Sequence, residues 1–162
     1  MNIIFEDRQE KIKLNEDIMN DIKNIMIECL NYEGYDDDYD VSLSFVDNDE
    51  IRELNREFRN IDKATDVLSF PLFTEEAEEN FAQMPFEEVE FGEISLGDIV
   101  ISLERAKEQS VEYNHSLKRE VCFLVCHSMF HLLGYDHDTD ENTKDMRKRE
   151  KDILNKLNIT KE

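Results

Sequence analysis

One segment of this chain, LKREVCFLVCHSMFHLL at residues 117–133, most narrowly limits how the chain can fold. Apolar residues fall on every side of its helical wheel, so a helix from about Ser116 to Leu133 has to be enclosed by the rest of the protein. A membrane cannot provide that enclosure, because the longest unbroken apolar run, Val121 to Cys126, is far too short to cross a bilayer. We therefore expect a core built around this helix, in which each polar residue has a specific role.

Histidines are prominent among those polar residues, and three of the chain's four lie in the run HSMFHLLGYDH at 127–137. His127 and His131 are one helical turn apart, so both imidazoles can approach a single ion. Gly134 can adopt the left-handed conformation that ends a helix, which lets His137 return to the same point. Three protein ligands leave the fourth tetrahedral position open to water, as in catalytic zinc sites. The run therefore predicts a single zinc-type ion on His127, His131 and His137.

The alternative for any single histidine is a hydrogen-bonded core or surface residue. We assign that role to His115, which precedes the helix cap Ser116 and lies too far from the cluster. Cys126 adjoins His127, but successive helical positions diverge by about 100°, so its thiol is not expected to share the ion. We interpret Cys122 and Cys126 as core residues.

Alternating and helical hydrophobic patterns divide the remaining chain into strands and helices. Most of the predicted helices lie in the last third of the chain. The acidic stretch at about 74–93 is predicted to be a solvated loop of a single domain spanning residues 1–162. Strands are expected at 3–5, 41–46, 66–71 and 97–102. Helices are expected from about Leu14 up to a stop at Gly34, after an acidic cap at 47–50 with Ile51, Leu54 and Phe58 on its apolar side, at 103–112, from about Ser116 to Leu133, and from about Asn142 to Leu157.

The charge of the chain restricts its partners. A formal net charge of -21 argues against general adhesion to DNA, RNA or anionic membranes, because such adhesion depends on clustered lysine and arginine. The odd cysteine count and the absence of a signal-peptide pattern favour a cytoplasmic protein with reduced thiols. No membrane association and no DNA binding are expected. The average charge does not describe its local distribution, so an acidic chain can still carry a basic patch.

The histidine run fits H-x-x-x-H-x-x-G-x-x-H, the ligand spacing of the metzincin proteases, in which a glutamate after the first histidine is the general base. That residue is Ser128 here, and a serine at its normal pKa cannot take the proton. The run instead resembles the YbeY family of bacterial metal-dependent endoribonucleases. LNREFRNIDKATDVLSFP at 54–71 and LGDIVIS at 96–102 resemble the same family, in the same order and at the same spacing over roughly residues 40–155.

The resemblance implies an α+β fold in which a small mixed β-sheet of about four strands is packed by helices. It implies a Zn²⁺-type ion on the three histidines, with Arg59 as a catalytic arginine beside the cleft and Met146 as an apolar floor under the metal. It also implies action on single-stranded RNA in ribosomal RNA maturation, including 3′-end processing in the small subunit, and in ribosome quality control. The implied partners are ribosomal RNA and the small ribosomal subunit with its proteins.

A phosphate-binding role for Arg59 is also supported by the spacing of the basic residues around it. Together with Arg52, Arg56 and Lys63 it could form a basic stripe that binds phosphate, beside residues predicted to face the core, namely Ile51, Leu54 and Phe58. The alternative for the other three cations, and for the basic run at 144–151, is a solvated helix face.

Several acidic residues remain ambiguous. Asp66 and Asp98 begin predicted strands and either cap the backbone or orient a ligand histidine. Asp136 and Asp138 flank His137 and could orient it or accept a proton. Two alternative functions also remain: a zinc metallopeptidase with Glu150 as base, and a non-catalytic ribosome-assembly factor with structural zinc.

Overall fold

The computed structural model describes residues 1–36, 38–72 and 94–159. The acidic loop predicted at about 74–93 lies outside these residues. None of the helices within the described ranges is long and apolar enough to span a bilayer.

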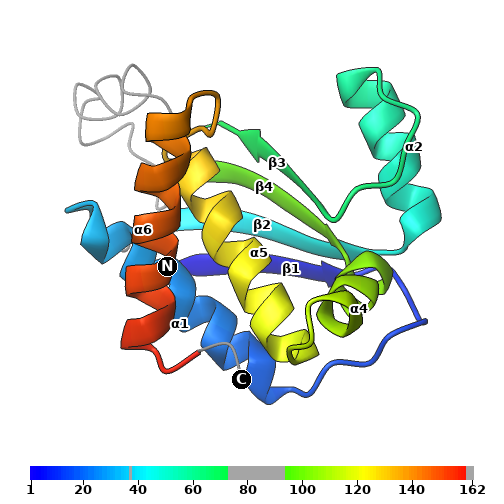
Figure 1. Cartoon of the computed structure of the whole chain (residues 1–162), viewed down its shortest axis with the longest axis horizontal. Coiled ribbons are helices and arrows are strands. Elements are labelled where there is room, and N and C mark those ends of the chain that lie inside the picture. The colour runs from blue at the N-terminus through cyan, green and yellow to red at the C-terminus, as the bar shows by residue number, and fades with distance from the viewer. Residues whose placement is uncertain (37, 73–93, 160–162) are drawn as a thin grey trace, which may run out of the picture.

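A four-stranded sheet forms the centre of the molecule, in the order β1-β2-β4-β3 (Figure 1). The strands β1 and β2 pair in parallel, as do β2 and β4, whereas β3 is antiparallel to β4. The predicted mixed sheet is therefore confirmed. The strands are β1 (Asn2–Asp7), β2 (Tyr39–Val46), β3 (Val67–Pro71) and β4 (Ile94–Ser102).

Helices cover both faces of this sheet. The larger core cluster joins Leu43 and Ile101 of the sheet to α1, α5 and α6, and α5 lies across that face (Figure 1). On the opposite face, α2 packs Ile51 against Leu68 and Val100. The described helices are α1 (Asp17–Tyr32), α2 (Asn48–Arg59), α4 (Leu103–Glu112), α5 (Leu117–Leu132) and α6 (Asp140–Lys156).

The helix α5 is enclosed as its sequence predicted. Most of its residues are buried, including Val121, Leu124, Val125 and Phe130. Ser116 caps its first turn, with the side-chain oxygen accepting a hydrogen bond from the backbone N–H of Arg119 at 3.1 Å. The rest of the fold thus holds the histidine-bearing helix in a fixed position.

The prediction for Phe58 was wrong. Its side chain is 61% exposed, and its ring meets that of Phe70 edge to face, with centroids 5.3 Å apart. The helix α2 buries only Ile51 and Asn55, and Phe58 lines an open pocket together with Leu54 and Phe70. The apolar stripe of α2 is therefore only partly covered.

Gly97 in β4 allows a close approach between β4, β3 and α5. Its φ is +139°, and a Cβ atom there would lie 2.2 Å from the carbonyl oxygen of Phe70 and 3.0 Å from Cδ2 of Leu132. We expect Gly97→Ala to lower the free energy of unfolding by at least about 1–3 kcal/mol, since the backbone would be strained and the β3–β4 pair would have to open. Urea denaturation measures this change in the free energy of unfolding, and Gly34→Ala is the comparison. Gly34 also has a positive φ, but no heavy atom lies within 4 Å of the position that a Cβ atom would take there.

Candidate metal centre

The turn after α5 brings the third histidine back to the first two. Gly134 has a φ of +100°, its N–H donates to the carbonyl of His131 at 3.0 Å, and the N–H of Tyr135 donates to the carbonyl of Phe130 at 2.9 Å. These two bonds form a Schellman motif, which ends the helix and reverses the chain. His137 therefore lies opposite the face of α5 that carries His127 and His131.

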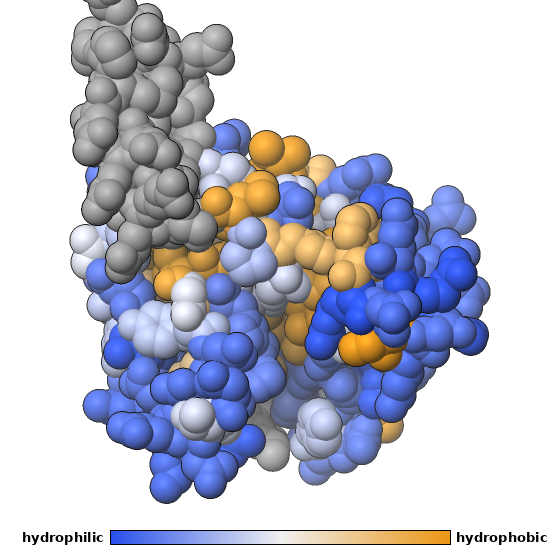
Figure 2. Space-filling view, turned by 90° about the horizontal axis from the view of Figure 1, so that it is seen from above, coloured by the Kyte–Doolittle hydropathy of each residue, from blue (hydrophilic) through white to orange (hydrophobic). Residues whose placement is uncertain are grey.

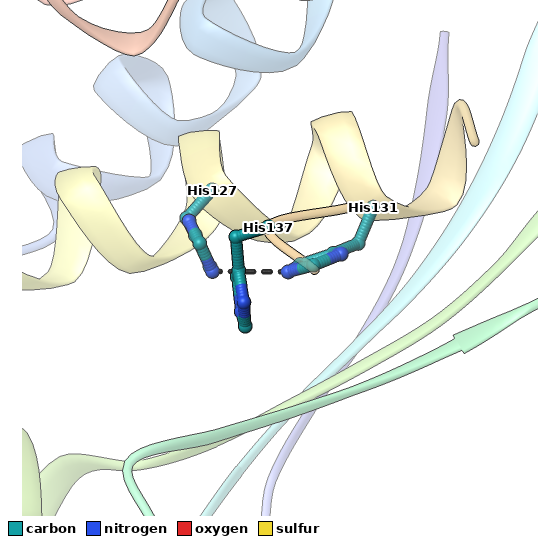
Figure 3. Close-up of side chains that lie close together, drawn as sticks. All are labelled: His127, His131 and His137. Atoms are coloured by element: carbon teal, nitrogen blue, oxygen red, sulfur yellow. Dashed lines mark hydrogen bonds between the residues drawn. The ribbon is translucent and has the colours of Figure 1, made fainter. Parts of the chain in front are cut away.

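The rings of His127 and His131 point toward each other, and the ring of His137 lies beside them (Figure 3). One ligand atom from each of His127, His131 and His137 lies within 4.8 Å of the others, and the Nε2 atoms of His127 and His131 are 3.0 Å apart. At zinc–nitrogen distances of about 2.0–2.1 Å, tetrahedral ligand atoms are separated by about 3.3 Å. The rings are thus close to the arrangement that one such ion requires.

Two of the rings are oriented by hydrogen bonds on their other nitrogen. Nδ1 of His127 lies 2.6 Å from Oε1 of Glu150, and Nδ1 of His131 lies 2.9 Å from the backbone carbonyl of Tyr135. Such partners of Nδ1 leave Nε2 as the free lone pair and hold the ring in a binding orientation. Burial, and next the neighbouring His127, lower the pKa of His131, which favours the neutral imidazole that a metal requires.

Glu150 is expected to strengthen metal binding through His127. We predict that Glu150→Gln lowers zinc affinity by about 10–100-fold, the usual effect of removing a carboxylate behind a ligand histidine. Competition with a chelator of known affinity measures the change. Glu141→Gln, on an exposed position in the first turn of the same helix, is the control and should leave affinity unchanged.

The turn that carries His137 is itself anchored. The hydroxyl of Tyr135 donates to Oε2 of Glu33 at 2.7 Å, and the guanidinium of Arg149 pairs with Glu33 and lies 4.5 Å from the centroid of the Tyr135 ring. The turn is thereby tied to α1 and α6, so the position of the third imidazole depends on the packing of three helices.

The cysteines take no part in this centre, as predicted. The thiols of Cys29 and Cys126 are buried together with their sulfur atoms 3.8 Å apart. Burial raises the pKa of Cys122 to about 12, so this thiol stays protonated. Within the described part of the chain, the candidate donor set therefore consists of imidazole nitrogens, which suit a borderline-soft divalent ion such as zinc.

A cavity of about 560 Å³ opens in front of the histidines. It is bounded by the end of α2, by the segment that leads into β3, by α5 and by the turn after α5. Figure 2 shows hydrophobic surface in the middle of the upper face of the molecule, with hydrophilic side chains on either side. The lining residues are Arg59, Thr65, Asp66, Val67, Leu68, Ser69, Pro71, His127, His131, Leu132, Gly134, Tyr135, Asp136 and His137.

Arg59 is placed at this cavity by the way α2 ends. It is the last residue of the helix, and Asn60 follows in the left-handed conformation with a φ of 59°. The buried Asn55 donates from Nδ2 to the carbonyl of Lys63 at 2.9 Å, which holds the loop against the helix. Arg52 instead pairs with Asp62 at 2.8 Å in solvent, as expected for a solvated helix face.

The structure distinguishes the four aspartates. Oδ1 of Asp66 accepts from the N–H of Val67 at 2.8 Å and Oδ2 accepts from Gln109 at 3.2 Å, so this carboxylate supports the start of β3 and no ligand histidine. Asp98 lines a different pocket beside Phe58. Asp138 accepts from Asn142 at 2.7 Å at the start of α6. Only Asp136 lines the metal cavity with one carboxylate oxygen that has no protein partner among the described residues.

The same geometry argues against the peptidase alternative. Glu150 contacts Nδ1 of His127, on the side of the ring opposite Nε2, so it orients a ligand and does not face the open position. Ser128 is fully buried and lines neither of the pockets that border the histidines. No glutamate among the described residues takes the position of a metzincin base.

His115 also lies where the sequence placed it, away from the cluster. Its Nε2 is 2.6 Å from Oε2 of Glu120, and both side chains are largely buried.

Fold and site together define an α+β protein with a zincin-like set of three histidines facing an open cavity.

Comparison with known proteins identifies the family. The family model for endoribonuclease YbeY matches residues 4–158. Endoribonuclease YbeY of Clostridioides difficile strain 630 is 66% identical over 162 residues, which cover 100% of each chain, and that of Alkaliphilus oremlandii strain OhILAs is 51% identical over 159 residues, covering 98% of this chain and 99% of the relative. The solution structure of TM1509 from Thermotoga maritima is similar, with a TM-score of 0.58 and 25% identity over 96% of this chain and 91% of that one.

The chain therefore belongs to the YbeY family of endoribonucleases. The resemblance seen in the sequence is confirmed, as are the fold class and the enzyme class, a hydrolase.

Proposed function

We propose that this protein, as a single domain spanning residues 1–162, is a metal-dependent endoribonuclease that cleaves single-stranded RNA. The observation that carries the proposal is that Arg59 and the three converging histidines line the same open cavity. A phosphodiester placed there would meet a bound cation on one side and a guanidinium on the other. The family of the chain supports RNA as the substrate.

Each part of the site has a distinct task in this proposal. His127, His131 and His137 hold one zinc-type ion, which when bound supplies Lewis acidity and lowers the pKa of water. Arg59 binds non-bridging phosphate oxygens through parallel hydrogen bonds and stabilises the charge that develops on them. Asp136 accepts a proton within the same cavity.

The cellular role that we propose is ribosomal RNA maturation in the cytoplasm, including 3′-end processing in the small subunit, together with ribosome quality control. The similarity to endoribonuclease YbeY along the whole chain supports it. With a net charge of -21, the protein would reach the ribosome through basic proteins of the small subunit more readily than through broad contact with RNA.

RNA cleavage by the purified protein tests the proposed activity. A labelled single-stranded RNA and the same RNA annealed to a complement are incubated with zinc-loaded protein, with chelator-treated protein, and with treated protein to which zinc has been restored. We expect cleavage of the single strand alone, loss of cleavage with chelator and recovery with zinc. Cleavage that the chelator does not change would overturn the metal mechanism, and cleavage of an unstructured protein with the RNA intact would favour the peptidase.

The acidity of the chain also favours one other function, a ribosome-assembly factor in which zinc only stabilises the fold. In that case chelation would unfold the protein, and a folded Arg59→Ala variant would support small-subunit maturation as well as the wild type. Circular dichroism of the chelated protein separates loss of fold from loss of catalysis.

A further inference from the structure

A second, smaller pocket of about 320 Å³ adjoins the metal centre on its other side. It lies between α5 and α6 and shares His127 and His137 with the larger cavity, so the two form one continuous surface around the histidines. Its size is at the lower end of the range for small-molecule sites, about 300–1,000 Å³. The proposed function described above assigns no ligand or substrate group to this pocket.

The walls of this pocket combine an aromatic ring, an apolar floor and a cation with Thr143 and with Glu150, whose carboxylate is engaged by Nδ1 of His127. Phe123 of α5 and the buried Met146 of α6 supply the apolar surface, and Arg147 of α6 supplies the charge. The ring of Phe123 is stacked against His127, with centroids 5.9 Å apart and planes 24° from parallel, and the guanidinium of Arg119 lies 5.7 Å from the centroid of the same Phe123 ring. These neighbours hold the Phe123 ring in place.

Arg147 differs from Arg149, two residues later on α6, in its ion pairs. Arg149 is committed to Glu33, Asp145 and the ring of Tyr135, whereas Arg147 is exposed and has no ion pair within the described part of the chain. Arg59, at the larger cavity, likewise has none among the described residues. The two pockets thus each carry an arginine whose hydrogen-bond donors are available to a ligand.

We propose that the second pocket is a subsite for one nucleotide of the RNA strand, next to the nucleotide whose phosphate is cleaved. This inference rests on the proposed endoribonuclease activity. The base packs against Phe123 and Met146, and because the faces of the ring are partly covered by its neighbours, the contact with the base plane is edge to face. Arg147 binds the phosphate of that nucleotide through its planar fork of donors.

Such a subsite explains how a strongly acidic protein can hold a single strand of RNA. Arg59 and Arg147 would bind phosphates in the two adjoining pockets, and the apolar wall of the second pocket would accept a base of any sequence, because every base has an aromatic face. A duplex keeps its bases paired and stacked, so its bases cannot enter the pocket. The subsite would thereby contribute to selection of single-stranded substrates.

An abasic scan tests the subsite through the substrate, without altering the fold. Oligouridylates that lack the base at one position each are cleaved by zinc-loaded protein, and kcat/KM is measured for each. We expect a loss of about tenfold at one position beside the cleaved bond, the size of a single base contact. That position-specific loss should largely disappear in Phe123→Ala and in Phe123→Leu, which keeps an apolar side chain but removes the aromatic ring. A uniform profile in the wild type would overturn the subsite.

Binding gives a readout that does not depend on cleavage. Fluorescence anisotropy with chelator present measures the affinity for labelled oligouridylate and for an abasic chain of equal length. The proteins compared are the wild type, Arg147→Gln and the control Lys148→Gln. Lys148 is an exposed cation on α6 that lines neither pocket. We expect tighter binding of the base-bearing chain and a weakening of several-fold in Arg147→Gln only. Equal binding of both chains, or equal effects of both substitutions, would refute the subsite. RNA left intact by the wild type with these binding differences preserved would refute the nuclease activity instead.

Discussion

Replacing His131 by alanine is expected to abolish both zinc retention and RNA cleavage. His131 supplies one of three nitrogens that lie within 4.8 Å of one another, and its ring is already oriented by the carbonyl of Tyr135. Loss of a partner that acts only through a ligand costs about 10–100-fold in affinity, so loss of a ligand itself should cost more than about 100-fold. Zinc content by elemental analysis and cleavage rates on the same preparations measure the two effects.

The matched control is the fourth histidine of the chain. His115 pairs with Glu120 at the start of α5, and His115→Gln keeps a donor for that buried carboxylate. This variant should retain one zinc per chain and wild-type cleavage. Full zinc occupancy in His131→Ala would contradict the assignment of the ligands. Loss of zinc with cleavage unchanged would show that the ion has no part in the reaction.

The clustering of His127, His131 and His137 was predictable because it depends on local geometry. The separation of His127 and His131 by four residues places them on one helix face in any α-helix, and Gly134 at the end of that helix can reverse the chain in a Schellman turn. The two bonds of that turn are present in the structure. Enclosure of α5 followed from its apolar residues in the same way.

The partners behind the ligands could not be found from the sequence alone. Glu150 reaches His127 only because α5 and α6 pack side by side, and the two residues are 23 positions apart. The carbonyl of Tyr135 carries no sequence signal, since every residue has one. Phe58 was misplaced for a related reason: helical periodicity shows which side of α2 is apolar but not which residues of that side the rest of the protein covers.

Arg59 shows both what local residues predict and what depends on the packing of the fold. Its helix and the cap at Asp47, whose Oδ1 accepts from the N–H of Glu50 at 2.9 Å, were readable from local residues. Its position at the histidine cavity was implied only by family resemblance, because it depends on the left-handed Asn60 and on the contact from Asn55 to Lys63. A basic stripe on a helix wheel does not show which of its cations faces the site.

Arg59→Ala is expected to lower kcat/KM for RNA cleavage by about 100–1,000-fold, the usual result of removing one donor that stabilises charge developing in a transition state. Arg59 is an exposed residue at the end of α2, and no ion pair within the described residues depends on it. The melting temperature and the zinc content should therefore stay at wild-type values. Arg59→Lys should recover only part of the rate, because an ammonium group lacks the planar fork that binds two phosphate oxygens.

Arg56→Ala is the control for this experiment, since Arg56 is an exposed cation one turn earlier on α2 that does not line the cavity. Both variants lose the same charge from the same helix, so a general electrostatic effect on RNA binding would slow them alike and would weaken as salt increases. A transition-state contact slows Arg59→Ala alone, and mainly through kcat, because the interaction strengthens as the phosphate gains charge. Equal losses in the two variants would contradict a catalytic role for Arg59 and would leave α2 as a basic surface that only attracts RNA.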